Sequence, residues 1–476
     1  MNVAKWFTVV VLLSAAVLGG ASGQTLTTLY SFDGGTNGVG PDSGLVQGSD
    51  GSFYGTTSSG GTNTVCGDKA GCGTVFKITP QGTLTTLWQF GTSLTDGLTP
   101  YDGLVQGNDG GFYGTTLGGG TNYSGTIFKI TPQGALTTLW QFGTSLTDGA
   151  EPRSGLVQGT DGDFYGTTQY GGTNYSGTIF KINPQGALTT LWQFSGKDGY
   201  SPSANLVQGR DGNFYGTTWQ GGTNNEGTVF KISSQGTLTV LWQFGSRPTD
   251  GSLPYAGLVQ GADGDLYGAT EDGGSHGWGM VFKITSQGTL TTLWQLGDNS
   301  TDGRQPNGLL QGSDGNFYGA TQVGGTNSDG TAFKITPQGT LTTLWQFNIT
   351  DGFFPYAGLV QGSDGSFYGT TDQGGLTNSS APYGRGTVFK ISVPLNPPAN
   401  QISSVQSDSS GTNLVFGIPS VAGETYQLQF TSDLASGIWT NVPSVSVTNS
   451  IGAMLTLTNF GGVVGPQGFY RFAITP

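Results

Sequence analysis

Charged residues are scarce in this sequence, and no basic stripe runs through it. Only 9% of its 476 residues are charged, and 29 acidic against 16 basic residues leave a net charge of −13. Nucleic-acid binding needs clustered Lys and Arg, so that class of partner is excluded. After the N-terminal region, no segment approaches the roughly 20 apolar residues of a membrane span, which predicts no transmembrane segment in the mature chain.

Histidine occurs once, at His276, and this scarcity limits the chemistry available. A Ser-His-Asp or Cys-His arrangement could form only around that residue. Nothing resembles a phosphate loop, a dinucleotide fingerprint or a metalloprotease helix. The inventory leaves enzyme activity undecided but favours a protein without catalytic residues and without a cofactor.

Cysteine occurs twice, at Cys66 and Cys72 in "VCGDKAGCG". In an oxidising compartment the two thiols would form one small disulfide loop. A zinc site is the alternative, but two thiols without a nearby histidine supply only half of the usual ligands. We therefore expect a disulfide and no metal.

The N-terminus has the pattern of a secretory signal peptide. Lys5 precedes an apolar run of about a dozen residues, and small residues follow around Ala21 and Gly23. We expect residues 1–23 to be removed by cleavage near Gly23. The mature protein would then be secreted or held at the cell surface, as a monomer.

Glycine is abundant, with 87 copies, because one passage recurs seven times. The first copy reads "GLVQGSDGSFYGTT" and begins at Gly44. The copies begin at Gly44, Gly103, Gly155, Asn205, Gly257, Gly308 and Gly358. Their tyrosines lie 50 to 59 residues apart, a period typical of a propeller or a solenoid.

A full repeat contains four strand patterns: "LVQG", "FYGTT", "TVFKI" and "TLTTLWQF". Asp50 and Gly51 connect the first two, and positive backbone angles at such a pair would give a tight hairpin. "TPQG" or a variant connects the last two, with proline presetting one turn position and glycine the strained one. Four antiparallel strands in about 50 residues predict one blade of a β-propeller.

The chain ends indicate how the ring closes. The seventh repeat lacks its fourth strand, whereas an orphan copy, "TLTTLYSF", begins at Thr25. The N-terminal strand would therefore complete the last blade, which leaves no pair of blade faces free. An open solenoid would instead need distinct capping repeats.

The repeat ends before a Pro-rich linker, and the whole sequence divides into four segments. We expect a signal peptide over residues 1–23, a seven-bladed propeller over 24–392, a linker over 393–400 and a β-domain over 401–476. The last segment has short alternating runs such as "TYQLQFTSD" and "FYRFAIT". Their spacing predicts a small β-sandwich of immunoglobulin or fibronectin type.

The composite "GLVQGxDGxFYGTTxxGGTNxxGTVFKITPQGTLTTLWQF" resembles the Gloeo/Verruco-type tandem repeat of secreted bacterial proteins, grouped with the choice-of-anchor proteins. The resemblance runs from Thr25 to Ser392, with Leu266 in place of the usual phenylalanine. The tail resembles a C-terminal β-domain common on exported proteins of similar bacteria. The resemblance implies a secreted repeat protein but brings no catalytic residues with it.

Side chains that recur in every blade are expected to have a structural role, because a single active site does not need seven copies. Aspartates of the first hairpin, such as Asp50, could pair with lysines of "FKI", such as Lys77. The tryptophans of "LWQF", with Tyr30 as the seventh equivalent, would pack between blades rather than bind sugar. A second set of aspartates precedes the first strands: Asp33, Asp96, Asp148, Asp198, Asp250, Asp302 and Asp351. They could form turns or, less readily, bind calcium.

Function is expected in the loops that vary between repeats. Loops after the second and fourth strands share one face of the disc, called here the variable-loop face, and the constant hairpins occupy the other. Aromatic or acidic residues of that face are our candidate ligand-binding residues: Trp219, Trp278, His276, Tyr123, Tyr175, Glu151, Glu271, Tyr255 and Tyr356.

Two classes of function remain open. The first is a non-catalytic protein that binds a polysaccharide or an extracellular or cell-surface protein through the variable-loop face. The second is a propeller glycoside hydrolase or polysaccharide lyase that uses two loop carboxylates, such as Glu151 and Glu271.

Overall fold

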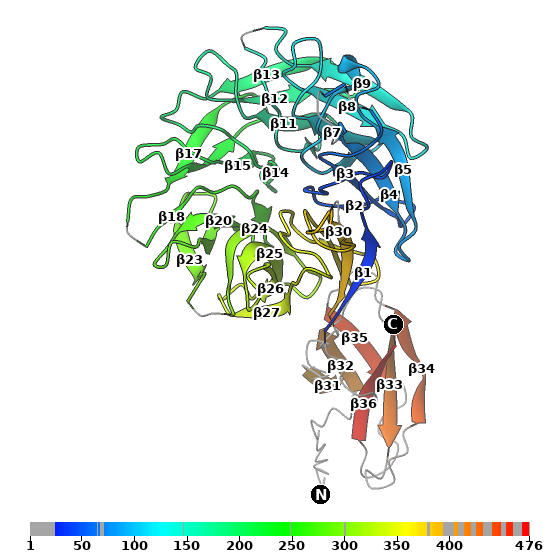
Figure 1. Cartoon of the computed structure of the whole chain (residues 1–476). Coiled ribbons are helices and arrows are strands. Elements are labelled where there is room, and N and C mark those ends of the chain that lie inside the picture. Colours follow the sequence, from blue (N-terminus) through cyan, green and yellow to red (C-terminus); the bar gives the residue numbers. More distant parts are fainter. Residues whose placement is uncertain are drawn as a thin grey trace, which may run out of the picture. The chain divides into compact units, whose positions relative to one another are not determined.

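The computed structural model describes residues 24–393 except 64, 67–70, 146, 248, 299–300 and 378–380, together with the backbones of six C-terminal strands. The expected signal peptide and nearly all of the expected linker lie outside the described residues. Seven four-stranded antiparallel sheets form the blades of a propeller (Figure 1). Among the described residues there is no α-helix, only one 3-10 turn at Leu94–Asp96. The predicted all-β propeller is confirmed.

The strands of each blade follow the four patterns of the repeat. The first strands are β2 (Val46–Gln47), β6 (Val105–Gln106), β10 (Val157–Gln158), β14 (Val207–Gln208), β19 (Val259–Gln260), β24 (Gly303–Gln311) and β28 (Val360–Gln361). The second strands are β3 (Phe53–Thr57), β7 (Phe112–Thr116), β11 (Phe164–Thr168), β15 (Phe214–Thr218), β20 (Leu266–Thr270), β25 (Phe317–Gly324) and β29 (Phe367–Thr371).

The outer half of each blade is equally regular. The third strands are β4 (Thr74–Ile78), β8 (Thr126–Ile130), β12 (Thr178–Ile182), β16 (Thr228–Ile232), β22 (Met280–Ile284), β26 (Thr331–Ile335) and β30 (Thr387–Ser392). The fourth strands are β5 (Leu84–Gln89), β9 (Leu136–Gln141), β13 (Leu188–Gln193), β17 (Leu238–Gln243), β23 (Leu290–Gln295), β27 (Leu341–Gln346) and, from the N-terminus, β1 (Thr25–Ser31). Two short strands, β18 (Gly251–Ser252) and β21 (Asp272–Gly273), pair in the loops of blade 5.

The N-terminal strand closes the ring as the repeat pattern predicts. The seventh sheet has the order β1-β30-β29-β28, so its outermost strand comes from the start of the chain. The Phe32 N–H donates to Gly386 O at 3.0 Å, and the Phe32 side chain is fully buried. Thr370 Oγ1 also donates to Ser43 O at 2.8 Å across 327 residues of sequence. Closure thus combines main-chain pairing with burial of an aromatic side chain.

Aromatic stacking joins neighbouring blades. The tyrosine of one "FYGTT" strand stacks on the phenylalanine of the next, as Tyr54 does on Phe112 with ring centroids 3.9 Å apart. Tyr368 of blade 7 meets Phe53 of blade 1 at 4.1 Å, so the series passes through the closure. Between blades 4 and 5 the partner is Leu266, the residue that departs from the repeat, so the Tyr215 ring packs there against an aliphatic side chain.

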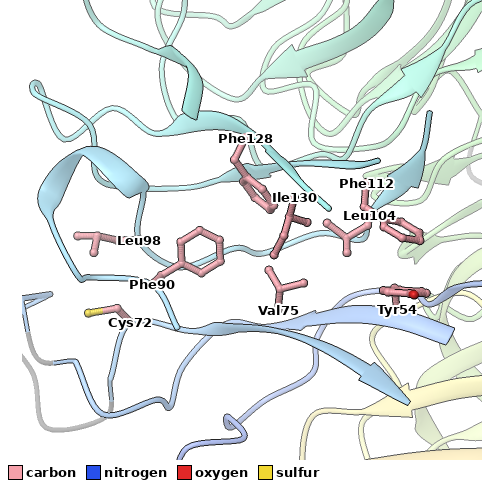
Figure 2. Close-up of a cluster of buried hydrophobic side chains, with 9 residues drawn as sticks. All are labelled: Tyr54, Cys72, Val75, Phe90, Leu98, Leu104, Phe112, Phe128 and Ile130. Atoms are coloured by element: carbon pink, nitrogen blue, oxygen red, sulfur yellow. The ribbon is translucent and has the colours of Figure 1, made fainter. Parts of the chain in front are cut away.

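The core lies between blades rather than within them. Figure 2 shows one such cluster, in which Val75 and Phe90 of blade 1 meet Phe128 and Ile130 of blade 2. Half-buried aromatic residues from fourth strands pack against these clusters, as predicted. They are Tyr30, Trp88, Trp140, Trp192, Trp242 and Trp294. The tryptophans therefore serve the fold, and a sugar platform need not be invoked.

The constant hairpin is held by its aspartate. Tyr54 Oη donates to Asp50 Oδ2 at 2.9 Å, and Lys77 Nζ lies 2.6 Å from the same oxygen. Equivalent ion pairs form in blades 2 to 5, so the predicted Asp–Lys pairing is confirmed in five repeats. In blade 4, burial opposes ionisation, but hydrogen bonds from Asn213, Tyr215 and Lys231 lower the pKa of Asp211 to about 2.

The expected backbone angles of this hairpin were partly wrong. Gly51 has a φ of 79°, but Asp50 is not among the residues with positive φ. The Asp50 carboxylate instead accepts the Ser52 N–H at 3.1 Å, which forms an Asx turn that the aspartate backbone adopts without strain. The second hairpin is as expected, with Gly82 at a φ of 92° and its N–H donating to Thr79 O.

The glycine of "FYGTT" is fixed by packing. A Cβ atom on Gly55 would lie 2.7 Å from Phe76 Cζ and 2.9 Å from Leu45 Cδ2, and both side chains are buried. We expect Gly55→Ala to lower the free energy of unfolding by about 1–3 kcal/mol, because the buried neighbouring side chains are close-packed and cannot move away from the added methyl group. Gly44→Ala is the matched control, since its Cβ would meet nothing nearer than Gly358 O at 3.9 Å. Equal urea midpoints for the two variants would contradict this account.

The described C-terminal strands are a separate unit. They are β31 (Ser404–Ser407), β32 (Leu414–Pro419), β33 (Thr425–Thr431), β34 (Thr440–Thr448), β35 (Met454–Asn459) and β36 (Phe469–Thr475). They pair into two three-stranded sheets, with the orders β31-β32-β35 and β34-β33-β36. The strand content agrees with a β-domain, and an immunoglobulin or fibronectin type of sandwich stays a prediction.

Candidate functional site

Two loop positions in each blade lie at the axis of the ring on the variable-loop face. One follows the repeat proline and leads into the first strand, which is innermost; the other directly follows the second strand. In blade 6 both positions lie within the longer strands β24 and β25. The first position holds Asp42, Tyr101, Arg153, Ser203, Tyr255, Asn307 and Tyr356. The second holds Ser58, Leu117, Gln169, Trp219, Glu271, Gln322 and Asp372.

The backbone at the axis brings these positions together. A Cβ on Gly103 would lie 2.8 Å from Gly44 O, and one on Gly155 would lie 3.0 Å from Gly103 O. Consecutive blades therefore approach closely where their first strands begin. The Asp102 carboxylate bridges the same region, because it accepts the N–H groups of Gly103 at 2.5 Å and Gly155 at 2.9 Å.

Asp42 and Asp372 form a carboxyl pair across the closure between blades 1 and 7. Burial, followed by the charge and the hydrogen bond of Asp372, raises the pKa of Asp42 to about 8. A hydrogen bond from Ser58 and the charge of Arg153 offset only part of this increase. Asp42 is therefore protonated at neutral pH, and its O–H can donate to Asp372.

Arg153 lies between two tyrosines from other blades. Its guanidinium carbon is 4.4 Å from the ring centroid of Tyr101 and 5.5 Å from that of Tyr255. Nη2 donates to Tyr101 Oη at 3.0 Å, whereas the buried Nε has no hydrogen-bond partner among the described residues. Burial, with Tyr101 nearby, raises the pKa of Tyr255, so this phenol stays neutral.

Glu271 and Tyr356 complete the cluster. Burial and then the charge of Asp272 raise the pKa of Glu271, while the Trp219 indole and Arg153 act in the opposite direction. Burial also raises the pKa of Tyr356. Charged and phenolic groups from four different blades raise the pKa of Tyr356 further: Asp372, Tyr101, Asp42 and Glu271. Such residues can gather only at the axis, and together they are called the axial cluster here.

The axial cluster includes four residues that the sequence singled out, namely Trp219, Tyr255, Glu271 and Tyr356. The other five candidates have surroundings of their own. Tyr123 and Tyr175 are exposed on loops between second and third strands. His276 Nε2 lies 3.6 Å from Asp298 Oδ1, Trp278 lies under the Arg304 guanidinium at 4.3 Å, and the Glu151 N–H donates to Ser124 O.

Sequence reasoning missed Asp42, Tyr101, Arg153 and Asp372. A signal was present, since these positions vary strongly between repeats although the letters on either side hardly change. "P" precedes one position and "GLVQG" follows shortly, and "FYGTT" precedes the other. Variation confined to single positions within a constant frame marks side chains that the fold leaves free for other roles.

The second set of aspartates has a structural role. Asp148, which is buried, accepts the backbone N–H of Thr144 at 3.1 Å and of Ser145 at 3.3 Å. Asp351 accepts the Asn348 N–H and Trp345 Nε1. These carboxylates stabilise the loops between blades, which is one of the two roles predicted for them. Across the described residues, no three His, Cys, Asp or Glu side chains gather in a way that could hold a metal ion.

The variable loop of blade 1 contains the disulfide that the sequence predicts. Cys66 and Cys72 are bonded, with Cα atoms 5.6 Å apart. Elsewhere, none of the helical structure in the described part of the chain is long and apolar enough to cross a membrane.

The chain matches the model of a known repeat family. The model of the Gloeobacter/Verrucomicrobia repeat matches residues 19–142, 64–262 and 246–426. No curated protein sequence matches the chain.

Several solved structures are similar at low identity. A putative gluconolactonase is 11% identical, with 78% of this chain and 93% of that chain covered and a TM-score of 0.41. The extracellular domain of a putative hybrid two-component system from B. thetaiotaomicron is 12% identical, with 91% and 53% covered and a TM-score of 0.48. A fungal alcohol oxidase in complex with copper is 14% identical, with 93% of each chain covered and a TM-score of 0.48.

Proposed function

The chain belongs to the Gloeobacter/Verrucomicrobia repeat family, and we propose that it is an exported protein that binds carbohydrate at the axial cluster of its propeller. The observation that carries this proposal is the meeting of Arg153, Tyr101, Tyr255 and the Asp42–Asp372 pair, contributed by blades 1, 2, 3, 5 and 7. Convergent polar groups among aromatic rings are typical of small-molecule sites.

The chemistry of the axial cluster suits a sugar. Guanidinium, carboxyl and phenol groups offer donors and acceptors for adjacent hydroxyls, and aromatic rings offer apolar faces for sugar C–H groups. The unpaired Arg153 Nε supplies a donor that a ligand oxygen could satisfy. Export is supported by the disulfide and by the N-terminal signal pattern.

Enzyme activity is a second candidate, favoured by Asp42, because a carboxyl that stays protonated at neutral pH can act as a general acid. The arrangement fits glycoside hydrolysis poorly, however. Glycosidase carboxylates flank the scissile bond about 5–9.5 Å apart, whereas Asp372 raises the pKa of Asp42 both by its charge and as a hydrogen-bond partner, an influence typical of adjacent carboxyls. Binding is therefore the better-supported function.

A polysaccharide panel tests the proposal. We expect the purified full chain to be retained on at least one of cellulose, chitin, xylan and mannan, without release of reducing ends. Tyr255→Ala and Arg153→Gln should each weaken retention about tenfold, the loss of roughly 1.4 kcal/mol of binding free energy. Tyr383→Ala, which alters an exposed tyrosine on a blade 7 loop, is the matched control.

Each outcome of this panel has a meaning. Released sugars would assign the axial cluster to catalysis instead. Failure of every polysaccharide to retain the chain would overturn carbohydrate binding and leave a surface protein as the partner. Melting curves of the two axial variants distinguish lost binding from lost folding.

A further inference from the structure

Two exposed tyrosines adopt a backbone conformation that other repeats fill with smaller residues. Tyr123 has a φ of 57° and Tyr175 a φ of 53°. The same loop position in blades 4, 5 and 6 holds Asn225, Gly277 and Ser328, also at positive φ. Glycine and asparagine adopt this left-handed conformation readily, whereas bulky residues rarely do. The repeats thus provide internal controls for the two tyrosines.

The loop itself imposes this conformation. The Tyr123 N–H donates to Gly120 O at 3.2 Å, and the Tyr175 N–H donates to Gly172 O at 3.1 Å. Asn225 makes the equivalent bond to Gly222 O at 3.4 Å. Because asparagine closes the same turn, a tyrosine is not needed to form the loop.

The two tyrosine side chains contribute little to the stability of the fold, because they are largely exposed. Their exposed fractions are 62% for Tyr123 and 68% for Tyr175. A non-glycine residue in this region costs on the order of 1 kcal/mol, and an exposed ring regains little of that through burial. Tyrosine is thus an unfavourable residue at this positive-φ position, and its presence on two neighbouring blades indicates a role other than folding.

The surroundings of the two rings indicate what they contact. Both loops contain "GGTNYSG", and residues 117–125 and 169–177 contain no charged residue. Thr, Asn and Ser offer hydroxyl and amide groups, as a neutral hydroxylated ligand requires. The rings occupy the same position in consecutive blades, so they are related by one step around the ring. A repeated pair of sites fits a ligand that also repeats.

We propose that Tyr123 and Tyr175 form a rim site on which a neutral polysaccharide chain stacks two of its sugar rings. The rim site rests on the carbohydrate binding proposed above, and it adds chain length to what the protein recognises. Two linked sites bind a polymer more tightly than either site alone. A disaccharide that fills only the axial cluster would gain nothing from the rim.

The double variant Tyr123→Asn/Tyr175→Asn tests this inference, because asparagine is the residue that blade 4 uses. We expect retention on the polysaccharide that holds the full chain to fall about tenfold, as loss of one of two linked sites predicts. Binding of the matching disaccharide, measured by calorimetry, should not change. The melting temperature should stay the same or rise, since the strained backbone is relieved.

The reverse change is the matched control. Asn225→Tyr adds a third ring at the equivalent position of blade 4 and should strengthen polysaccharide retention. If the double variant is retained as strongly as the full chain, the rim site is wrong while axial binding stands. If disaccharide binding is lost together with retention, the two tyrosines belong to the axial function instead. If the full chain is retained on no polysaccharide, both proposals fail.

Discussion

A chain that begins at Asp33, and so lacks Thr25–Phe32, is expected to unfold roughly 10 °C below the full chain. Loss of the fully buried Phe32 side chain alone should cost about 3–5 kcal/mol. Loss of β1 adds the main-chain pairing with β30 and the packing of Leu29 and Tyr30 on the cluster between blades 7 and 1. For a domain of this size, each kcal/mol shifts the melting temperature by only about 1–2 °C.

The same deletion should also promote association. Without β1, strand β30 becomes an edge with unpaired N–H and C=O groups, which can pair with another chain. Calorimetry and light scattering measure the two effects. A synthetic peptide with the sequence "TLTTLYSF" should restore the melting temperature, and a scrambled peptide should not. A monomeric deletion variant that melts within 2 °C of the full chain would contradict strand-mediated closure.

Asp42→Asn is expected to remove a loss of stability between about pH 4 and pH 8. The pKa of Asp42 is raised from 3.8 to about 8 in the folded chain, chiefly by burial and then by Asp372. In this window the unfolded chain has released the proton that the folded chain keeps, so the free energy of unfolding falls as pH rises. The contribution is fully present below pH 4 and lost by pH 8, with an upper limit of about 6 kcal/mol.

Asparagine imitates the protonated acid, because its amide can donate to Asp372 as the carboxyl O–H does. The variant and the original chain should therefore have similar stability at pH 4, and the variant should be the more stable at pH 9. Burial also raises the pKa values of Asp102 and Glu271, so only the difference between the two chains isolates Asp42. Urea unfolding at several pH values measures it, with exposed Asp33→Asn as the control. Parallel profiles would rule out a proton held by Asp42.

The repeat made the fold readable from the sequence. Seven copies of one passage gave the blade number, and the orphan strand at Thr25 gave the closure before any contact was known. Local chemistry sufficed for the Asp50–Lys77 pair, since both residues belong to one blade. The hairpin angles at Asp50 were misjudged because the aspartate side chain supplies the turn bond that positive φ would otherwise favour.

The axial cluster was only half predictable, for a geometric reason. Tyr255 and Glu271 were found because they are aromatic or acidic and break the repeat. Asp42, Arg153 and Asp372 are separated in sequence by most of the ring, and their contacts exist only once the ring has closed. When each loop is considered separately, its length and its aromatic residues stand out. Single positions from different blades that meet at the axis do not.

Closure by β1 also sets an order of events in time. The strand that is synthesised first finds its partner, β30, only after the whole propeller has been made, as the Thr370–Ser43 bond over 327 residues illustrates. Contacts so distant in sequence form slowly, since the loop between them must first be ordered. The last blade can therefore form only in a complete chain. A prematurely terminated chain can stack its early blades, but it lacks β30, so its first strand has no partner to pair with.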